Sequence, residues 1–206
     1  MPLINNLERE ECNIEKIFEL CNLTDKSIFI DLGANLGQQV RYLKGKRIKT
    51  FAFEPHPVIF KKLEECAGDD ENIKLYQKAA WITEQKAYLF FKGTPSAING
   101  GASLIYEKTN IHKGDAFQIE TIDFSKFLKE LSKEIEVLKI DIEGAEYHLI
   151  DYLIKEGSIN FCKNLFVEDH ERKIFKESQF YQSYIEKRTE IYQFFEKSKI
   201  NYYNWK

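Results

Sequence analysis

Short apolar runs alternate with segments of helical spacing along most of the chain. The apolar runs predict strands, and the segments with apolar side chains three or four positions apart predict helices. The expected strands cover residues 27–31, 48–54, 72–77, 87–91, 117–122, 136–141, 164–168 and 200–205. The expected helices cover residues 8–21, 36–44, 57–66, 123–131, 145–155 and 180–197. This alternation predicts an α/β fold with a mostly parallel central sheet and helices on both faces.

The length of the chain favours a single domain. Its 206 residues suffice for one buried core, and the sequence contains no internal repeat, linker or low-complexity tract. We expect an N-terminal helical segment (1–25), a ligand-binding core (27–170) and a C-terminal helix and strand (171–206). Residues 94–101, which are rich in Gly, Ser, Asn and Pro, are predicted to form a mobile loop.

Composition limits the partners and the compartment. The net charge of −3 argues against a nucleic-acid partner, because phosphate binding draws on a surplus of Lys and Arg. The four cysteines are scattered without a C-x-x-C pair, which is typical of reduced thiols. No stretch approaches the roughly 20 apolar residues of a membrane span, and the first residues do not resemble a secretory signal. We therefore expect a cytoplasmic protein without a membrane or nucleic-acid partner.

The first candidate site follows the strand at residues 27–31. Gly33 and Gly37 allow a tight turn that brings the backbone close to a ligand, and a helix N-terminus follows. Asp31, just before the turn, would repel a pyrophosphate but suits a cationic ammonium, such as the amino-acid end of S-adenosylmethionine. The Gly33-x-x-x-Gly37 spacing also differs from the G-x-G-x-x-G pattern of NAD sites. The alternative is a turn of purely structural use.

The second candidate is Glu54, at the end of the next strand. It lies 23 positions after Asp31. Rossmann-type folds place an acid about 20 residues after the glycine turn, where it accepts hydrogen bonds from ribose hydroxyls. A lone Glu at a strand end is usually a solvated surface residue, but the register with Asp31 favours nucleoside binding.

Two later strands also end in acidic residues. Asp141 and Glu143 follow one strand, and Glu168 and His170 follow the next. Because ligands of open α/β sheets bind at the carboxyl ends of strands, these acids could bind substrate hydroxyls, form a metal site or offset a cofactor's charge. Glu146 is interpreted instead as a first-turn acid that the helix dipole favours. His170 is either a general base, since its ordinary pKa near ~6.5 suits that role, or a structural residue.

Four segments together resemble the FkbM family of methyltransferases. They are residues 30–37, 53–55, 138–146 and 167–170, and their order and spacing fit from about residue 27 to 170. The resemblance implies a Rossmann-like class I methyltransferase fold. It also implies methyl transfer from S-adenosylmethionine, commonly to a hydroxyl oxygen of a sugar, a polyketide-type product or another small metabolite. The part beyond residue 171 matches no pattern of the family, and we expect substrate choice to lie there.

The resemblance also implies roles for single residues. Those expected to bind the cofactor are Asp31, Gly33, Asn35, Gly37, Glu54, Ala79 and Ala80. Those expected to face the acceptor are Asp141, Glu143, Glu168 and His170, together with Ser103 in the loop beyond the third strand. No metal is required by these assignments.

The expected mechanism aligns an acceptor oxygen with the sulfonium methyl and removes a proton. His170 is the predicted base, with Asp141 or Glu168 orienting it or the acceptor. An alternative is a divalent metal held by Asp141, Glu168 and His170. Two other classes stay open: an NAD-dependent oxidoreductase, and a cofactor-binding partner subunit without catalysis of its own.

Overall fold

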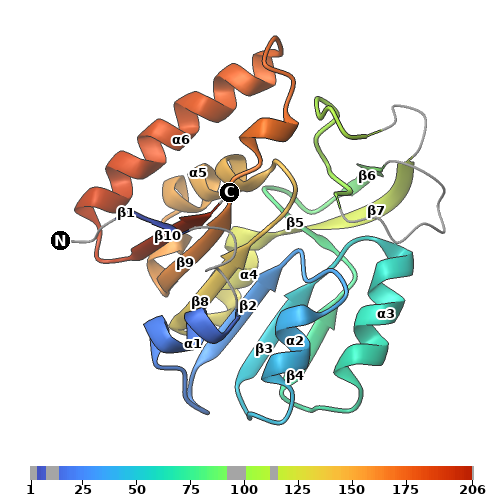
Figure 1. The fold of residues 1–206 in the computed structure, drawn as a ribbon, viewed down its shortest axis with the longest axis vertical. Coiled ribbons are helices and arrows are strands. Elements are labelled where there is room, and N and C mark those ends of the chain that lie inside the picture. The colour runs from blue at the N-terminus through green and yellow to red at the C-terminus, as the bar shows by residue number, and fades with distance from the viewer. Residues whose placement is uncertain (1–3, 8–13, 92–100, 112–115, 206) are drawn as a thin grey trace.

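A computed structural model describes residues 4–7, 14–91, 101–111 and 116–205 of the chain (Figure 1). Its central sheet consists of β1 (Ile4–Leu7), β2 (Ile28–Leu32), β3 (Lys49–Phe53), β4 (Ile73–Tyr76), β8 (Ile135–Ile140), β9 (Cys162–Glu168) and β10 (Asn201–Trp205). The strands lie in the order β1-β10-β9-β8-β2-β3-β4, and every neighbouring pair is parallel. The α/β fold with a parallel central sheet that the sequence predicted is confirmed.

Helices cover both faces of this sheet. They are α1 (Ile14–Cys21), α2 (Gln38–Leu43), α3 (Pro57–Ala67), α4 (Phe124–Leu131), α5 (Glu146–Lys155), α6 (Gln179–Lys197) and the short 3₁₀ turns η1 (Ser158–Phe161) and η2 (Glu171–Lys173). Successive strand residues point to opposite faces. Ile28, Ile30 and Leu32 therefore pack with α4, α5 and α6, whereas Phe29 packs with α1 and α2. Both faces of β2 are buried, which explains why Asp31 is the one polar residue in this strand.

The strand order reverses beside β2. The chain runs from β2 outward through β3 and β4, and later from β8 outward through β9 and β10 on the other side of β2. The helices after β2 and β8 therefore cover opposite faces, and a crevice forms at the carboxyl ends of these two strands. Ligands of open α/β sheets bind at such a switch point.

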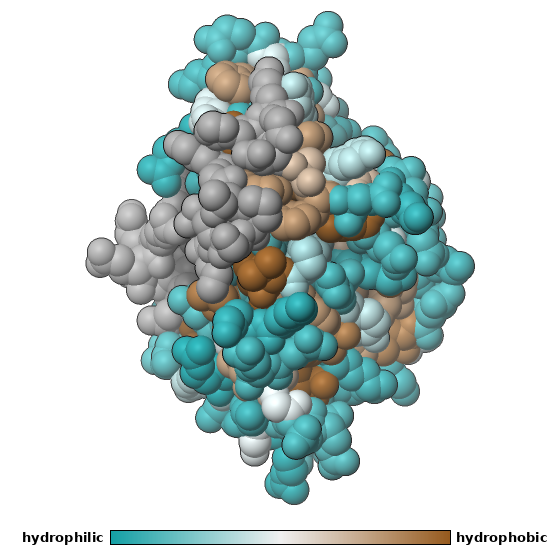
Figure 2. Space-filling view, turned by 90° about the vertical axis from the view of Figure 1, so that its right-hand side faces the viewer, coloured by the Kyte–Doolittle hydropathy of each residue, from teal (hydrophilic) through white to brown (hydrophobic). Residues whose placement is uncertain are grey.

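A small second sheet lies beside this end of the molecule (Figure 1). It contains β5 (Ala79–Trp81), β7 (Ala116–Asp123) and β6 (Lys86–Phe90), in which β5 and β7 are parallel and β6 and β7 antiparallel. The face on this side of the molecule is mostly hydrophilic, with hydrophobic residues gathered around its middle (Figure 2). No helix in the described part of the chain combines the length and apolar character needed to cross a membrane.

The N-terminal segment differs from the expectation of a helical region over residues 1–25. Residues Ile4–Leu7 form the edge strand β1, which pairs with β10, and the described helix begins at Ile14. Four residues are too few for a periodic signal, and their partner strand is the last in the chain. The expected start of this helix, residues 8–13, and residues 94–100 of the expected loop lie outside the described residues.

Candidate active site at the carboxyl ends of the strands

A pocket opens at the carboxyl ends of β2, β3 and β8. Five of the seven residues expected to bind a cofactor line it: Gly33, Asn35, Glu54, Ala79 and Ala80. Two residues expected to face the acceptor, Asp141 and Glu143, also line this pocket. The fold thus gathers into one wall residues that are more than a hundred positions apart in the chain.

Gly33 joins the turn after β2 to the turn after β8. Its φ angle is 80°, and a Cβ atom on it would lie 1.8 Å from the carbonyl oxygen of Asp141, so no other residue fits without displacing the backbone. The amides of Gly33 and Ala34 both donate to the carbonyl oxygen of Phe53, at 3.0 and 2.9 Å. The amide of Asp141 donates to the carbonyl oxygen of Leu32 at 3.0 Å. Three strand ends are therefore held together beneath the pocket.

Glu54 presents a buried carboxylate in the pocket wall. Its Oε2 accepts from the Asn35 amide at 3.0 Å, and its Oε1 accepts from the His56 amide at 2.8 Å. Each oxygen keeps acceptor capacity beyond these bonds. Burial raises the pKa of Glu54 to about 7, although the two amide bonds oppose this shift. A fixed carboxylate of this kind suits a neutral pair of donors, such as two ribose hydroxyls.

Asp31 lies beneath the pocket rather than in its wall. Its side chain is 0% exposed, and Oδ1 accepts from Lys139 Nζ at 3.1 Å. Lys139 lies opposite Asp31 in β8, and its Nζ is also 3.4 Å from Asp141 Oδ2. Burial by itself would lower the pKa of Lys139, but the carboxylates of Asp31 and Asp141 raise it above its ordinary value. The acid that the sequence assigned to a cationic ligand thus faces a cation of the chain itself.

The sequence pattern did not single out Lys139, although a visible signal exists. It is the one charged residue in the apolar run Val137-Leu-Lys-Ile140. A charge inside a buried strand requires a partner. The partner could not be named from the sequence, because it lies in another strand.

Gly37 is the other expected cofactor residue that does not line the pocket. It precedes α2 with a φ angle of 79°. A Cβ atom here would lie 2.9 Å from Leu63 Cδ1 and 3.0 Å from Cys66 Sγ. The missing side chain at Gly37 therefore permits the close packing of α2 on α3. Gly37 supports the turn without contacting the pocket.

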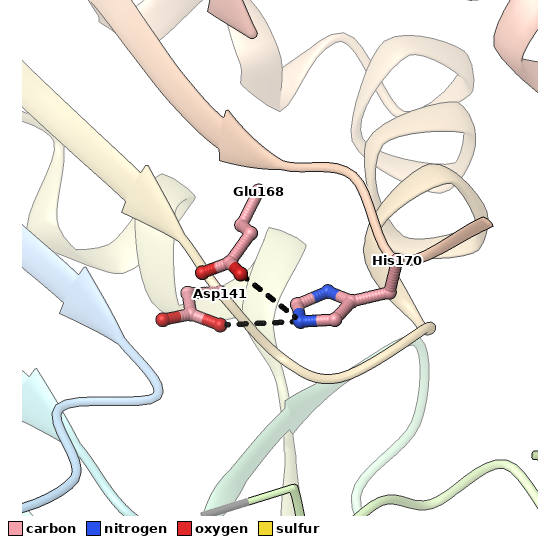
Figure 3. Close-up of side chains that lie close together, drawn as sticks. All are labelled: Asp141, Glu168 and His170. Atoms are coloured by element: carbon pink, nitrogen blue, oxygen red, sulfur yellow. Dashed lines mark ion pairs between the residues drawn. The ribbon is translucent and has the colours of Figure 1, made fainter. Parts of the chain in front are cut away.

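Four acids surround His170 and form with it an acid–histidine cluster: Asp141, Glu143, Glu146 and Glu168 (three of the five residues are drawn in Figure 3). Nε2 of His170 lies 3.8 Å from Asp141 Oδ1, 3.5 Å from Glu143 Oε2 and 3.6 Å from Glu168 Oε1. Burial by itself would lower the pKa of His170, but Glu146 and Glu143 outweigh it and raise the pKa to about 10. In this arrangement the imidazole has to lose a proton before it can act as a base.

Glu146 has a larger role than the first-turn acid interpreted from the sequence. It is fully buried, and its Oε1 lies 2.8 Å from His170 Nδ1. Its carboxylate also accepts from the amide of Ile142 at 3.1 Å and from the amide of Gly144 at 3.0 Å. One side chain therefore fixes the turn after β8 and orients the histidine. The signal that could have indicated this role is the turn at residues 142–144, because its buried backbone amides need a hydrogen-bond acceptor nearby.

Glu143 and Ser103 connect the turn after β8 to the loop at residues 101–111. Ser103 is buried, donates from Oγ to the Glu143 carbonyl oxygen at 2.7 Å and accepts from the Ile105 amide at 2.9 Å. The Glu143 carboxylate pairs with Lys108 and, at 2.9 Å, with Lys173. Glu143 therefore lines the pocket as expected, whereas the Ser103 hydroxyl, expected to face the acceptor, bonds within the protein.

The C-terminal helix holds the loop that carries His170. The Tyr184 hydroxyl accepts from the His170 amide and donates to Asp169 Oδ1, both at 3.2 Å. Arg188 Nη1 donates to Asp169 Oδ2 at 3.0 Å. The region beyond residue 171, where we expected substrate choice, therefore fixes the loop at Asp169 and His170 through α6.

The family comparison covers this whole arrangement. A family model described as the Methyltransferase FkbM domain matches residues 31–200. The chain belongs to the FkbM methyltransferase family. The match includes the pocket, the acid–histidine cluster and α6, so the FkbM domain extends about 30 residues past the point where the motifs resembling the family end.

Among characterised proteins, this FkbM domain is similar to Methyltransferase 1 of Beauveria bassiana (strain ARSEF 2860). The two are 26% identical over 159 residues, which is 68% of this chain. The chain spans 64% of the length of that relative. No solved structure gives a significant match.

Proposed function

We propose that this protein is an S-adenosylmethionine-dependent methyltransferase that methylates a hydroxyl of a small metabolite, such as a sugar. The observation that carries the proposal is Glu54, a buried carboxylate fixed by two backbone amides in the wall of a pocket at the switch point of the sheet. Membership of the FkbM family supports the type of reaction.

The residues of the pocket fit this cofactor. Glu54 would accept hydrogen bonds from both ribose hydroxyls, and the turn at Gly33 and Asn35 would bind the amino-acid end. Ala79 and Ala80 are small and would leave room for the flat adenine ring. Asp31 would act on this end of the pocket through its charge and through Lys139. The bound cofactor would supply a methyl group that is already activated.

The acceptor would lie beside the acids of the same pocket. Carboxylates accept hydrogen bonds from hydroxyl groups, so Asp141 and Glu143 favour an acceptor that carries several hydroxyls. Asp141 and Glu168 would orient the reacting hydroxyl, and His170 would take up its proton once the imidazole has given up its own. Positioning of this kind supplies much of the rate enhancement in a transfer between two bound substrates.

Parallel calorimetric titrations with S-adenosylmethionine, S-adenosylhomocysteine and NAD test the proposal. We expect one-to-one binding of the first two and none of NAD. Glu54→Gln is expected to weaken S-adenosylhomocysteine binding by about tenfold or more, because a hydrogen bond to a charged group contributes about 1.5–3 kcal/mol. Glu64→Gln, at an exposed position of α3, is the matched control and should leave the affinity unchanged.

Three results would contradict the proposal or part of it. Folded protein that binds neither S-adenosylmethionine nor S-adenosylhomocysteine would overturn it. Binding of NAD instead would favour the oxidoreductase alternative. Binding of the methyl donor without transfer to any member of a panel of sugars and other hydroxylated metabolites would favour a partner subunit without catalysis of its own.

A further inference from the structure

Three potential metal ligands converge beside the cofactor pocket. Asp141 follows β8, and Glu168 and His170 lie at and just beyond the end of the neighbouring β9. Each offers one ligating atom, and these atoms all lie within 4.8 Å of one another. Figure 3 shows both carboxylates turned toward the same edge of the imidazole ring.

The nitrogen at the centre of this group makes no well-formed hydrogen bond to any residue that the structure describes. The His170 side chain is only 1% exposed, yet its Nε2 has no hydrogen-bond partner among the described residues. The nearest oxygens of Glu143, Glu168 and Asp141 lie 3.5, 3.6 and 3.8 Å from this nitrogen, longer than a good hydrogen bond. Buried polar atoms are rarely left in this state, and this one is surrounded by three carboxylates. Glu143 is already paired with Lys108 and Lys173, which leaves Asp141 and Glu168 as the ligand candidates.

The other ring nitrogen is held as in a metal-binding histidine. Nδ1 lies 2.8 Å from Glu146 Oε1, and backbone amides fix that carboxylate in turn. A histidine ligand commonly donates its second N–H to a carboxylate, which sets the ring orientation and leaves the first nitrogen for the ion. The orientation of Asp141 also agrees, because Lys139 contacts its Oδ2 while its Oδ1 faces His170.

We propose that Asp141, Glu168 and His170 bind one divalent cation. Two carboxylates and one imidazole combine hard oxygen ligands with a nitrogen ligand, a set that Mn²⁺ can accept. Three protein ligands leave coordination positions open. His170 would then be a ligand rather than the base itself.

The position of the ion gives it a role that rests on the proposed function. Asp141 is both a ligand and part of the pocket wall, so the cation would lie where the acceptor meets the cofactor. A hydroxyl oxygen bound to a divalent cation loses its proton more readily. The cation would therefore select acceptors by a hydroxyl that can reach it.

Titration of chelator-treated protein with Mn²⁺ tests the site directly, with free Mn²⁺ measured by electron paramagnetic resonance. We expect one ion per chain. His170→Gln, Asp141→Asn and Glu168→Gln should each weaken binding by at least about tenfold. His148→Gln is the matched control, because His148 lies in α5 and stacks on Phe180 outside the cluster. Asp141→Asn provides a second test if the buried His170 variant does not fold, since Asp141 is partly exposed.

The two proposals fail in different ways. If folded protein binds S-adenosylhomocysteine but no Mn²⁺, Zn²⁺ or Mg²⁺, the cation site is wrong and the proposed function stands. If Mn²⁺ binds equally well to the three variants, the ion lies elsewhere and the inference is overturned. If Mn²⁺ binds as expected but neither S-adenosyl compound does, the cation site stands and the proposed function fails.

Discussion

The side chains that shape this site act mainly on one another. Lys139 links Asp31 to Asp141, and Glu146 links His170 to the turn after β8. A buried charge without a partner is strongly unfavourable, so each of these groups requires the next. Truncation of one of them should therefore disturb the pocket even where the side chain itself does not line it.

The pKa of Glu54 makes a prediction about pH. Burial raises this pKa to about 7, so the carboxylate is more costly to ionise in the folded than in the unfolded protein. By itself, Glu54 therefore contributes stability at low pH that is lost as the pH rises through about 7. In the proposed complex, ribose hydroxyls would donate hydrogen bonds to the ionised form. Binding of S-adenosylhomocysteine should therefore strengthen by up to about tenfold per pH unit below 7 and level off above it.

Calorimetry of S-adenosylhomocysteine binding between pH 5.5 and 8.5 checks this expectation. Glu54→Gln should remove most of the pH dependence, because the variant cannot ionise at this position. An affinity that stays constant over the range, or that falls as the pH rises, would show that Glu54 does not bind the ligand as a carboxylate.

At the scale of the elements, the sequence predicted what depends on neighbours along the chain. The predicted strands at 136–141 and 164–168 correspond to β8 and β9, because a strand buried on both faces is mostly apolar and leaves a local signal. The predicted strands at 87–91 and 117–122 correspond to β6 and β7, but the strands β1 and β5 and the separate sheet of β5, β6 and β7 were not predicted. Their pairings join distant segments, and pairing partners leave no local pattern.

The same distinction applies to the candidate site. Gly33 and Glu54 were singled out because a strand, a turn and the next strand set their spacing, and Asn35 followed from the family resemblance. The bonds of Lys139 and Glu146 were not predicted, because their partners come from other turns and strands. The sequence therefore indicated where the site lies, but not which of its side chains face a ligand and which face each other.

The turn from β2 into α2 can be tested with a matched pair of glycines. Gly33 and Gly45 have φ angles of 80° and 77°, but a Cβ atom on Gly45 would meet nothing within 4 Å. Gly45→Ala should therefore cost only the left-handed backbone, about 1–2 kcal/mol. Gly33→Ala adds the clash with Asp141 and should cost at least about 1–3 kcal/mol more. Urea denaturation of both variants measures the difference, and equal losses would mean that the β2 and β8 turns are not in close contact.

At the scale of the whole molecule, the pocket is formed by segments from most of the chain. A ligand bound there should therefore stabilise the whole fold as one cooperative unit. Its walls run from the turn after β2 to the start of α5, and α6 supports the loop behind them. A ligand that binds only the folded state at 100 times its dissociation constant adds about 2.7 kcal/mol of stability. For a chain of this length that corresponds to a rise in Tm of about 5–10 °C.

Scanning calorimetry with S-adenosylhomocysteine should show a single transition that shifts as a whole, because one sheet carries both halves of the site. Two transitions, of which only one moves, would mean that the segment beyond residue 171 folds apart from the pocket and that its contacts to Asp169 and His170 do not hold the site together.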